Sequence, residues 1–444
     1  MKTPKIHPLI ARAKEYGSIP GLDTVKALLE ELDNPQEKLQ IIHVAGTNGK
    51  GSIASFLEGM LMENHYQVGL FTSPYFHDPR EMIRFNRELI PQKDFEKILE
   101  TLAIAVEKML IKGKSHPTEF EIYVALAFYY FSRISTDLLI LEAGLGGRED
   151  ATNVIDNPIL SVITQIGLDH TELLGNTLEE IADHKGGIIK TRVPVVLFPQ
   201  EPRARRVLES IARKSNSPLY SFEPNQVTIH SSSLEEQCFS VDFTSFPGGC
   251  SRTKIRLPGK HQVFNGATAL LALYVLQKQG LFPMTFDSIA QGLFAVQWPG
   301  RFEVLGREPL TIVDGAHNLA AAKALTGTLD QHCRQYSITL ILGMLEDKDV
   351  EGFLSEIIPY VDRVILTKPL NPRAMPPQQL KEQLQGYAVD TFLEPSISKA
   401  SFKALSITDP SGMILGVGSL YMIGEARKVF LKYFRAHQPS PKQS

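Results

Sequence analysis

Apolar and polar positions follow each other along this chain in the manner of repeated βα units. Short, continuous apolar runs of the kind found in strands buried on both faces are separated by segments with helical periodicity. After residue 50, for example, one helical face carries Ile53, Phe56, Leu57, Met60 and Leu61. The pattern predicts strands near 41–45, 68–71, 137–144, 159–164, 193–198, 311–313, 338–342, 361–366 and 413–417, and helices near 7–16, 94–110, 118–133, 177–185 and 259–279.

A different pattern covers residues 225–257. Short runs with alternating side chains are separated there by serine and glycine turns, which predicts a small antiparallel sheet attached to the first part of the chain. The best candidate for a linker is Trp298-Pro299-Gly300-Arg301, and βα units begin again after it. We therefore expect an α/β protein with two domains, residues 1–297 and a smaller Rossmann-like α/β domain at 298–444.

Composition limits the class of protein. At 444 residues the chain exceeds what one core usually supports, and its net charge of −3 provides no basic footprint for nucleic acid. No run of eighteen apolar residues and no signal-peptide core occur, so we expect no membrane association. The three cysteines lack the paired spacing of a disulfide framework or a zinc site, and they fit a reducing cytoplasm: Cys238, Cys250 and Cys333.

A glycine-rich turn joins the first predicted strand to the first long helix. Its residues are Gly46, Thr47, Asn48, Gly49, Lys50, Gly51 and Ser52. Backbone N–H groups of such a turn, the helix N-terminus and the lysine together form a phosphate cradle. The spacing departs from the standard P-loop because Gly51 separates Lys50 from the hydroxyl of Ser52. We consider a ligand-free turn the weaker alternative, and we predict that the first domain is a P-loop mononucleotide-binding domain.

Polar residues also follow two later strands. Glu142 lies near the end of an apolar run, and carboxylates at the carboxyl end of a parallel strand face the ligand crevice. His170 follows another strand, where a lone histidine fits a structural role as well as metal or phosphate binding. Because Mg²⁺ takes one or two carboxylates plus phosphate oxygens, Glu142 and Ser52 predict a MgATP site. No Ser-His-Asp order occurs, so we expect chemistry at a phosphoryl group.

Eight segments spread over most of the chain closely resemble the folylpolyglutamate synthase and dihydrofolate synthase family, relatives of the murein peptide ligases. In order they are HVAGTNGKGS, FTSP, EAGLGGREDATN, IGLDHTELLGNTLEEIADHKGGIIK, LPGKHQVFN, WPGRFEV, DGAHN and LGMLEDKD. The resemblance implies an ATP-dependent ligase that joins L-glutamate to a pteroate or folate carboxylate, with dihydropteroate or a reduced folate as substrate. The carboxylate first becomes an acyl phosphate, because a carboxylate is inert to amines until its oxygen can leave.

The resemblance also implies roles for individual residues. Catalytic roles fall to Lys50, His170, Lys185 and Arg301, and Lys185 matches a lysine that is carbamylated by carbon dioxide in relatives. Two magnesium ions are implied, with Ser52, Ser73 and Glu142 at the first and His170 at the second. Contacts to ATP fall to the glycine-rich turn 46–52 and to Asn265, Arg301, Asp314 and His317. We expect the active protein to be a monomer.

The chain departs from the family pattern at a few positions. Tyr75 replaces a common histidine, Gly187 and Leu319 replace an alanine and a proline, and Glu149 adds a charge within GGRxDATN. The Arg148 form of that segment resembles bacterial members that also make dihydrofolate. Two alternatives stay open: a murein-type peptide ligase, although only 45 residues precede Gly46 where those relatives carry a whole nucleotide-sugar domain, and a non-catalytic ATP-binding switch.

Overall fold

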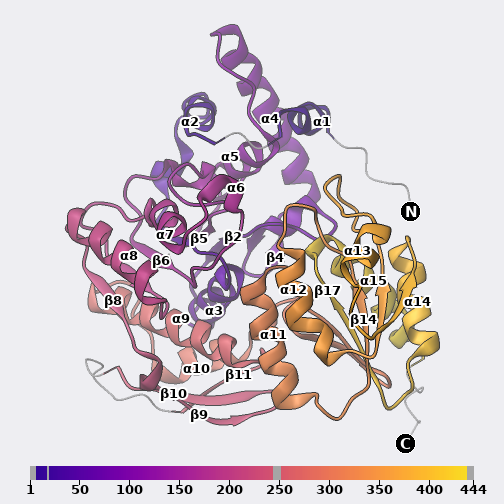
Figure 1. The fold of residues 1–444 in the computed structure, drawn as a ribbon. Helices are drawn as coiled ribbons and strands as arrows, with labels where there is room; N and C mark the ends of the chain where they lie inside the picture. The colour runs from indigo at the N-terminus through magenta and orange to yellow at the C-terminus, as the bar shows by residue number, and fades with distance from the viewer. Residues whose placement is uncertain (1–6, 18–19, 244–251, 438–444) are drawn as a thin grey trace, which may run out of the picture.

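The computed structural model describes residues 7–17, 20–243 and 252–437, and these form three sheets with their helices (Figure 1). The first sheet has eight strands in the order β4-β3-β2-β5-β1-β6-β7-β8. All neighbours from β2 to β8 pair in parallel, whereas β3 and β4 form an antiparallel hairpin at one edge. The strands are β1 Ile41–Ala45, β2 Val68–Phe71, β3 Ile83–Phe85, β4 Glu88–Leu89, β5 Leu138–Glu142, β6 Leu160–Ile163, β7 Val195–Leu197 and β8 Leu219–Ser221.

Helices cover both faces of this sheet. In β5 the side chains alternate, so Leu139 and Leu141 pack in one cluster with α2, α4 and α5, while Leu138 and Ile140 pack in another with α3, α9 and α10. Burial on both faces explains why the strand reads as a continuous apolar run. The helices are α1 Pro8–Ala13, α2 Asp23–Glu30, α3 Lys50–Glu63, α4 Gln92–Ile111, α5 Glu119–Phe131, α6 Thr171–Leu174, α7 Leu178–Gly186, α8 Pro202–Lys214, α9 Lys260–Lys278 and α10 Phe286–Phe294.

A small antiparallel sheet lies beside this unit, as predicted. Its strands are β9 Val227–Ser232, β10 Gln237–Val241 and β11 Thr253–Ile255, in the order β11-β10-β9. Phe239 of β10 is fully buried and joins the cluster of α9. The β9–β10 turn reaches the C-terminal unit, where Glu235 pairs with Arg307 at 2.8 Å. Of the three cysteines of the sequence, Cys250 lies outside the described residues.

The C-terminal unit, orange to yellow in Figure 1, has a six-stranded sheet in the order β12-β13-β17-β14-β15-β16. Only β12 is antiparallel to its neighbour, so the sheet is Rossmann-like. Its strands are β12 Glu303–Arg307, β13 Leu310–Val313, β14 Ile338–Leu342, β15 Arg363–Leu366, β16 Asp390–Leu393 and β17 Met413–Val417. Its helices are α11 Leu319–His332, α12 Val350–Ile357, α13 Pro377–Gln383, α14 Ile397–Ile407 and α15 Leu420–Ala436.

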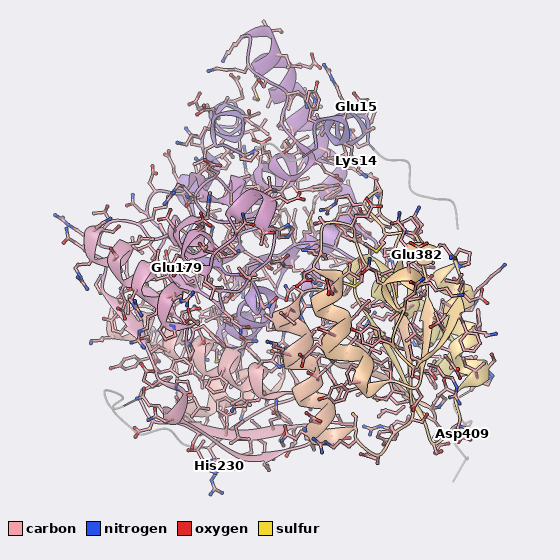
Figure 2. All side chains as sticks on the ribbon, viewed as in Figure 1. Lys14, Glu15, Glu179, His230, Glu382 and Asp409 are labelled. Atoms are coloured by element: carbon pink, nitrogen blue, oxygen red, sulfur yellow. The ribbon has the colours of Figure 1, made fainter. Side chains whose placement is uncertain are left out.

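The predicted α/β class and the small sheet are confirmed. The pattern missed the short strands β3, β4, β8, β12 and β16 at or near the sheet edges, which are partly exposed and carry no continuous apolar run. Charges of both signs lie at the periphery, as Lys14, Glu382 and Asp409 illustrate in Figure 2. Within the described ranges no helix has the length and apolarity that crossing a bilayer requires.

The segment that connects the two units packs against the glycine-rich turn. Trp298, the one tryptophan of the sequence, has the Arg84 guanidinium 5.0 Å from its ring centroid. A Cβ atom on Gly51 would lie 3.0 Å from the Trp298 indole nitrogen, so only glycine lets the two segments approach this closely. The connection between the units is therefore part of the surroundings of the turn.

Candidate active site between the two units

The glycine-rich turn leaves the end of β1 and is pinned to the end of β6. The Thr47 N–H donates to the Gln165 carbonyl at 2.8 Å, and the Thr164 hydroxyl donates to the Asn48 carbonyl at 2.7 Å. Lys50, the first residue of α3, folds back so that its Nζ donates to the Gly46 and Thr47 carbonyls at 3.1 and 3.2 Å. This is the geometry of a phosphate cradle with its lysine over the turn.

Gly49 gives a direct test of this turn. Its φ of 88° lies in the left-handed region, and a Cβ atom there would lie 2.6 Å from the Asn265 amide oxygen. We expect Gly49→Ala to lower kcat/KM for ATP by about 10- to 100-fold, because the turn must shift away from Asn265. The matched control is Gly113→Ala, whose glycine also has a positive φ, 76°, but has open space around its Cβ position. Equal activity of the two variants would contradict the assignment of this turn.

Oxygen atoms from three elements converge beside the turn. Glu142 is buried at the end of β5, with its Oε1 3.9 Å from Lys50 Nζ. Burial raises the pKa of Glu142 to about 7, against the opposing charges of Lys50 and Arg301. The Ser52 hydroxyl is buried without a hydrogen-bond partner, and Ser73 follows β2 close by. An unsatisfied buried hydroxyl and a carboxylate beside a phosphate cradle fit a magnesium ion held together with phosphate oxygens.

Lys185 lies on α7 directly beneath the turn. Its side chain is buried, and its Nζ donates to the Gly46 carbonyl at 2.8 Å. Burial, followed by the charge of Lys50, lowers the pKa of Lys185 to about 7. A large fraction of these amines is therefore neutral near neutral pH, which a solvated lysine would not be.

His170 lies in a cluster formed by both units. Its backbone has a φ of 51° at the start of α6, and its Nε2 is 3.3 Å from Nζ of Lys348 of the C-terminal unit. Lys348 also pairs with Asp169 at 2.5 Å. Burial and then the Lys348 charge lower the pKa of His170 to about 4, so its imidazole is neutral near pH 7, the form in which histidine ligates metal ions. Among the described residues no group of three or more His, Cys, Asp and Glu has the arrangement of a metal cage.

Arg301 and Asp314 approach the turn from the C-terminal side. Arg301 donates to the Gly300 carbonyl at 3.1 Å. The Asp314 carboxylate accepts from the backbone N–H groups of Phe302 and Ala316 at 2.7 and 2.8 Å, so it fixes the backbone next to Arg301. His317, in the same loop, lies with its Nε2 3.5 Å from Asp169.

Two cavities lie between the units and share residues. One of about 130 Å³ is bordered by the turn 47–52, Asn265, Arg301 and Asp314. The other, about 350 Å³, is bordered by the loop 144–147 together with Phe120, His170, Lys348, Ser419 and Tyr421. Four residues border both: Ser73, Pro74, His317 and Leu420. The structure thus brings most predicted site residues to one seam, which has a phosphate side at the glycine-rich turn and a second, larger side. Lys185 borders neither cavity and lies beneath the turn, against the Gly46 carbonyl.

Sequence reasoning missed several residues of this seam. They are Asp169, Asn318, Lys348 and Ser419, whose hydroxyl is buried and has no hydrogen-bond partner. Asp169, Asn318 and Lys348 lie inside segments that carry the family resemblance, which was the available signal. Ser419 precedes α15 and stands outside those segments.

The comparisons with known proteins agree with this geometry. The family model for the Mur ligase middle domain matches residues 44–273, just over half of the chain, and that for the Mur ligase glutamate ligase domain matches residues 300–420. The chain therefore has the domains of a Mur-type amide ligase.

Full-length relatives narrow this class. A dihydrofolate synthase/folylpolyglutamate synthase of Bacillus subtilis is 33% identical over 93% of this chain and 96% of its own, and a folylpolyglutamate synthase of Lacticaseibacillus casei is 34% identical over 92% and 94%. Among solved structures, Mycobacterium tuberculosis folylpolyglutamate synthase complexed with ADP and AMPPCP has a TM-score of 0.85 and 28% sequence identity, and the match covers 95% of this chain and 98% of that one. E. coli FolC in complex with DHPP and ADP has a TM-score of 0.84 and 28% sequence identity, with 97% of this chain and 99% of that one covered. The chain belongs to the folylpolyglutamate synthase/dihydrofolate synthase family.

Proposed function

We propose that this protein joins L-glutamate to the carboxylate of dihydropteroate or of a reduced folate, converting ATP to ADP and phosphate. The observation that carries the proposal is the meeting of two cavities at Ser73 and His317, one bordered by the glycine-rich turn and a larger one of about 350 Å³ beside it. Relatives that span more than nine tenths of the chain bear these activities in their names, and two of the similar solved structures hold ADP. A reaction between the two ligands takes place where the cavities join.

On the phosphate side, the N–H groups of the turn and Lys50 hold the triphosphate. Asn265, Arg301, Asp314 and His317 complete the nucleotide site. This assignment is supported by the fact that all four residues border the smaller cavity. Arg301 and Asp314 belong to the second unit and border the cavity from that side. Closure of this kind excludes water from an acyl phosphate, which water would otherwise hydrolyse.

We assign the first of two magnesium ions to Ser52, Ser73 and Glu142, and the second to His170. The unpartnered Ser52 hydroxyl, the buried Glu142 and the neutral imidazole of His170 fit this assignment. Magnesium bound there neutralises charge on the phosphate oxygens. Lys50 acts beside the first ion, because its Nζ lies within 4 Å of Glu142 and over the turn.

Lys185 is proposed to carry a carbamate. Carbon dioxide adds to a neutral amine, and the buried Lys185 amine has a pKa of about 7. A carbamate replaces a cation by an anion beneath the turn, where it can approach magnesium that an ammonium would repel. The present contact of Nζ with the Gly46 carbonyl places the group directly under the phosphate cradle.

On the larger side, the acceptor carboxylate becomes an acyl phosphate and the glutamate amine then displaces phosphate. We assign the carboxylates of glutamate to Lys348 and to the start of α15, where the Ser419 hydroxyl has no partner. The dipole of α15 and the Lys348 charge favour an anionic amino acid over a neutral one.

We further propose that the chain has domains at residues 1–297 and 298–444, that the active protein is a monomer and that its location is cytoplasmic.

Product analysis tests the proposed function. After incubation with MgATP, L-glutamate and either dihydropteroate or tetrahydrofolate, mass spectrometry is expected to show a product heavier by one glutamyl residue and one ADP per bond formed. The Arg148 form of the loop 148–153 leads us to expect both acceptors to react. Omission of glutamate is the control. Release of ADP that needs neither glutamate nor acceptor would instead indicate a nucleotide switch.

A further inference from the structure

Asn318 lies buried at the seam, at the N-cap of α11, and all of its amide atoms are engaged. Its side-chain oxygen accepts from the Ala321 N–H at 2.9 Å, which caps the helix, and from the Asn48 amide at 3.2 Å. Its Nδ2 donates to the Asn48 side-chain oxygen at 3.2 Å and to Asp169 at 3.0 Å. One residue of the C-terminal unit thus bonds two separate loops of the N-terminal unit.

The first of these loops is the glycine-rich turn. The backbone of Asn48 is held by its own unit, through Thr164 and Gln165. Its side chain, in contrast, makes a reciprocal pair of amide hydrogen bonds with Asn318. Asn48 lies between Thr47 and Gly49, so the orientation of the middle of the turn depends on a residue of the other unit.

The second loop carries Asp169, the neighbour of His170. Its carboxylate accepts from Asn318 and from Lys348, and His317 lies 3.5 Å away, so three groups of the C-terminal unit converge on it. The carboxylate is nearly inaccessible to solvent, where hydrogen bonds to a charged group are strongest and their loss most costly. Asn318 connects this carboxylate to the turn by its single amide.

We propose that Asn318 is a positioning residue that couples the docking of the C-terminal unit to the phosphate turn. Docking brings the amide of Asn318 to Asn48 and Asp169 at the same time, so the turn and the His170 loop take their reactive arrangement only when the units are together. The inference rests on the proposed function, since it concerns how the site for ATP and acceptor is assembled. Asn318 itself touches neither the predicted metal oxygens nor Lys50 in the hydrogen bonds described.

Asn318→Asp separates this role from helix capping. Aspartate keeps the oxygen that caps α11 and is as good an N-cap as asparagine, so the fold is retained. It replaces the Nδ2 donor by an oxygen that faces the Asp169 carboxylate and the Asn48 side-chain oxygen. Two hydrogen bonds are thereby replaced by repulsive contacts between oxygen atoms. We expect kcat for ligation to fall about 100-fold, because misplacement of a reacting group by about 1 Å costs that much, while KM for ATP changes less than about threefold. The control is Asn225→Asp, which adds the same charge at an exposed site.

Exchange of the two side chains provides the decisive readout. In Asp169→Asn with Asn318→Asp, donor and acceptor of this hydrogen bond trade places and the net charge is restored, while the ion pair of Asp169 with Lys348 is lost, so recovery stays partial. We expect kcat at least about tenfold above that of Asn318→Asp alone, a coupling that two unrelated structural losses would not give. Wild-type kcat in Asn318→Asp, or purely additive losses in the double variant, would overturn the proposal. If the wild-type protein failed to ligate glutamate at all, the proposed function would fail instead, so the two failures are distinguishable.

Discussion

Lys50→Ala is expected to abolish turnover, with kcat for ligation lowered by at least about 10³-fold. The Lys50 ammonium is held over the turn by the carbonyls of Gly46 and Thr47, and it lies beside the buried carboxylate of Glu142. Removal of the ammonium takes away a mobile cation beside the outer phosphates and leaves Glu142 without the opposite charge that acts on it most strongly. The measurement is ADP release in the presence of glutamate and tetrahydrofolate.

Lys260 offers a matched control for this variant. It is the first residue of α9 and follows a glycine with positive φ, Gly259, just as Lys50 follows Gly49 at the start of α3. Its side chain is exposed and borders neither cavity. We expect Lys260→Ala to keep its rate within about threefold of wild type, as surface substitutions do. Normal rates in Lys50→Ala would remove the phosphate cradle from the mechanism.

The initial rate of Lys185→Ala is expected to be at least about 10²-fold below that of wild type. Part of this rate should return when a short carboxylic acid is supplied in solution. Deletion of the side chain leaves a space beneath the turn that a small carboxylate can enter and occupy in place of the carbamate. The substitution also removes a partner of the Gly46 carbonyl, which the added acid cannot replace, so recovery stays incomplete. The measurement is the initial rate with increasing acid concentration.

The behaviour with pH supplies a second observation on Lys185. Below a pH of about 7 its amine becomes protonated and cannot take up carbon dioxide, so wild-type activity should fall there and depend more on added bicarbonate. Lys190→Ala is the control, because Lys190, although only partly buried, likewise donates to a backbone carbonyl, that of Asn153 at 3.3 Å. The rate of Lys190→Ala should not respond to the added carboxylic acid. Full activity of Lys185→Ala without any additive would exclude Lys185 from the reaction.

Local sequence patterns were enough to predict the strand, turn and helix that form the phosphate side of the seam. The apolar run of β1, the glycines of the turn and the periodicity of α3 are contiguous in sequence, so each can be recognised from neighbouring residues alone. Glu142 could be placed by the same logic, because β5 pairs directly with β1 and the carboxyl ends of parallel strands meet at one edge. These predictions needed only the rules of strands and helices.

The rest of the seam depends on contacts between distant parts of the chain. Lys348 meets Asp169 across 179 positions, and Asn318 meets Asn48 across 270. No periodicity or spacing specifies which polar residues of one unit face those of another, because that depends on how two sheets dock. The burial of Lys185 beneath the turn is of the same kind, since a lysine near the end of an amphipathic helix would otherwise be expected in solvent.

The division of one site between two units also has a consequence for the synthesis of the protein. Arg301 and Asp314 leave the ribosome about 250 positions after Lys50, which at about 5–20 residues per second is a delay on the order of 10–50 s. During that interval the nascent chain already contains the glycine-rich turn, but Arg301 and Asp314, the groups that we propose to close the site, have not yet been made. On the proposed function, an unfinished chain would therefore be unable to convert ATP and an acceptor to an acyl phosphate.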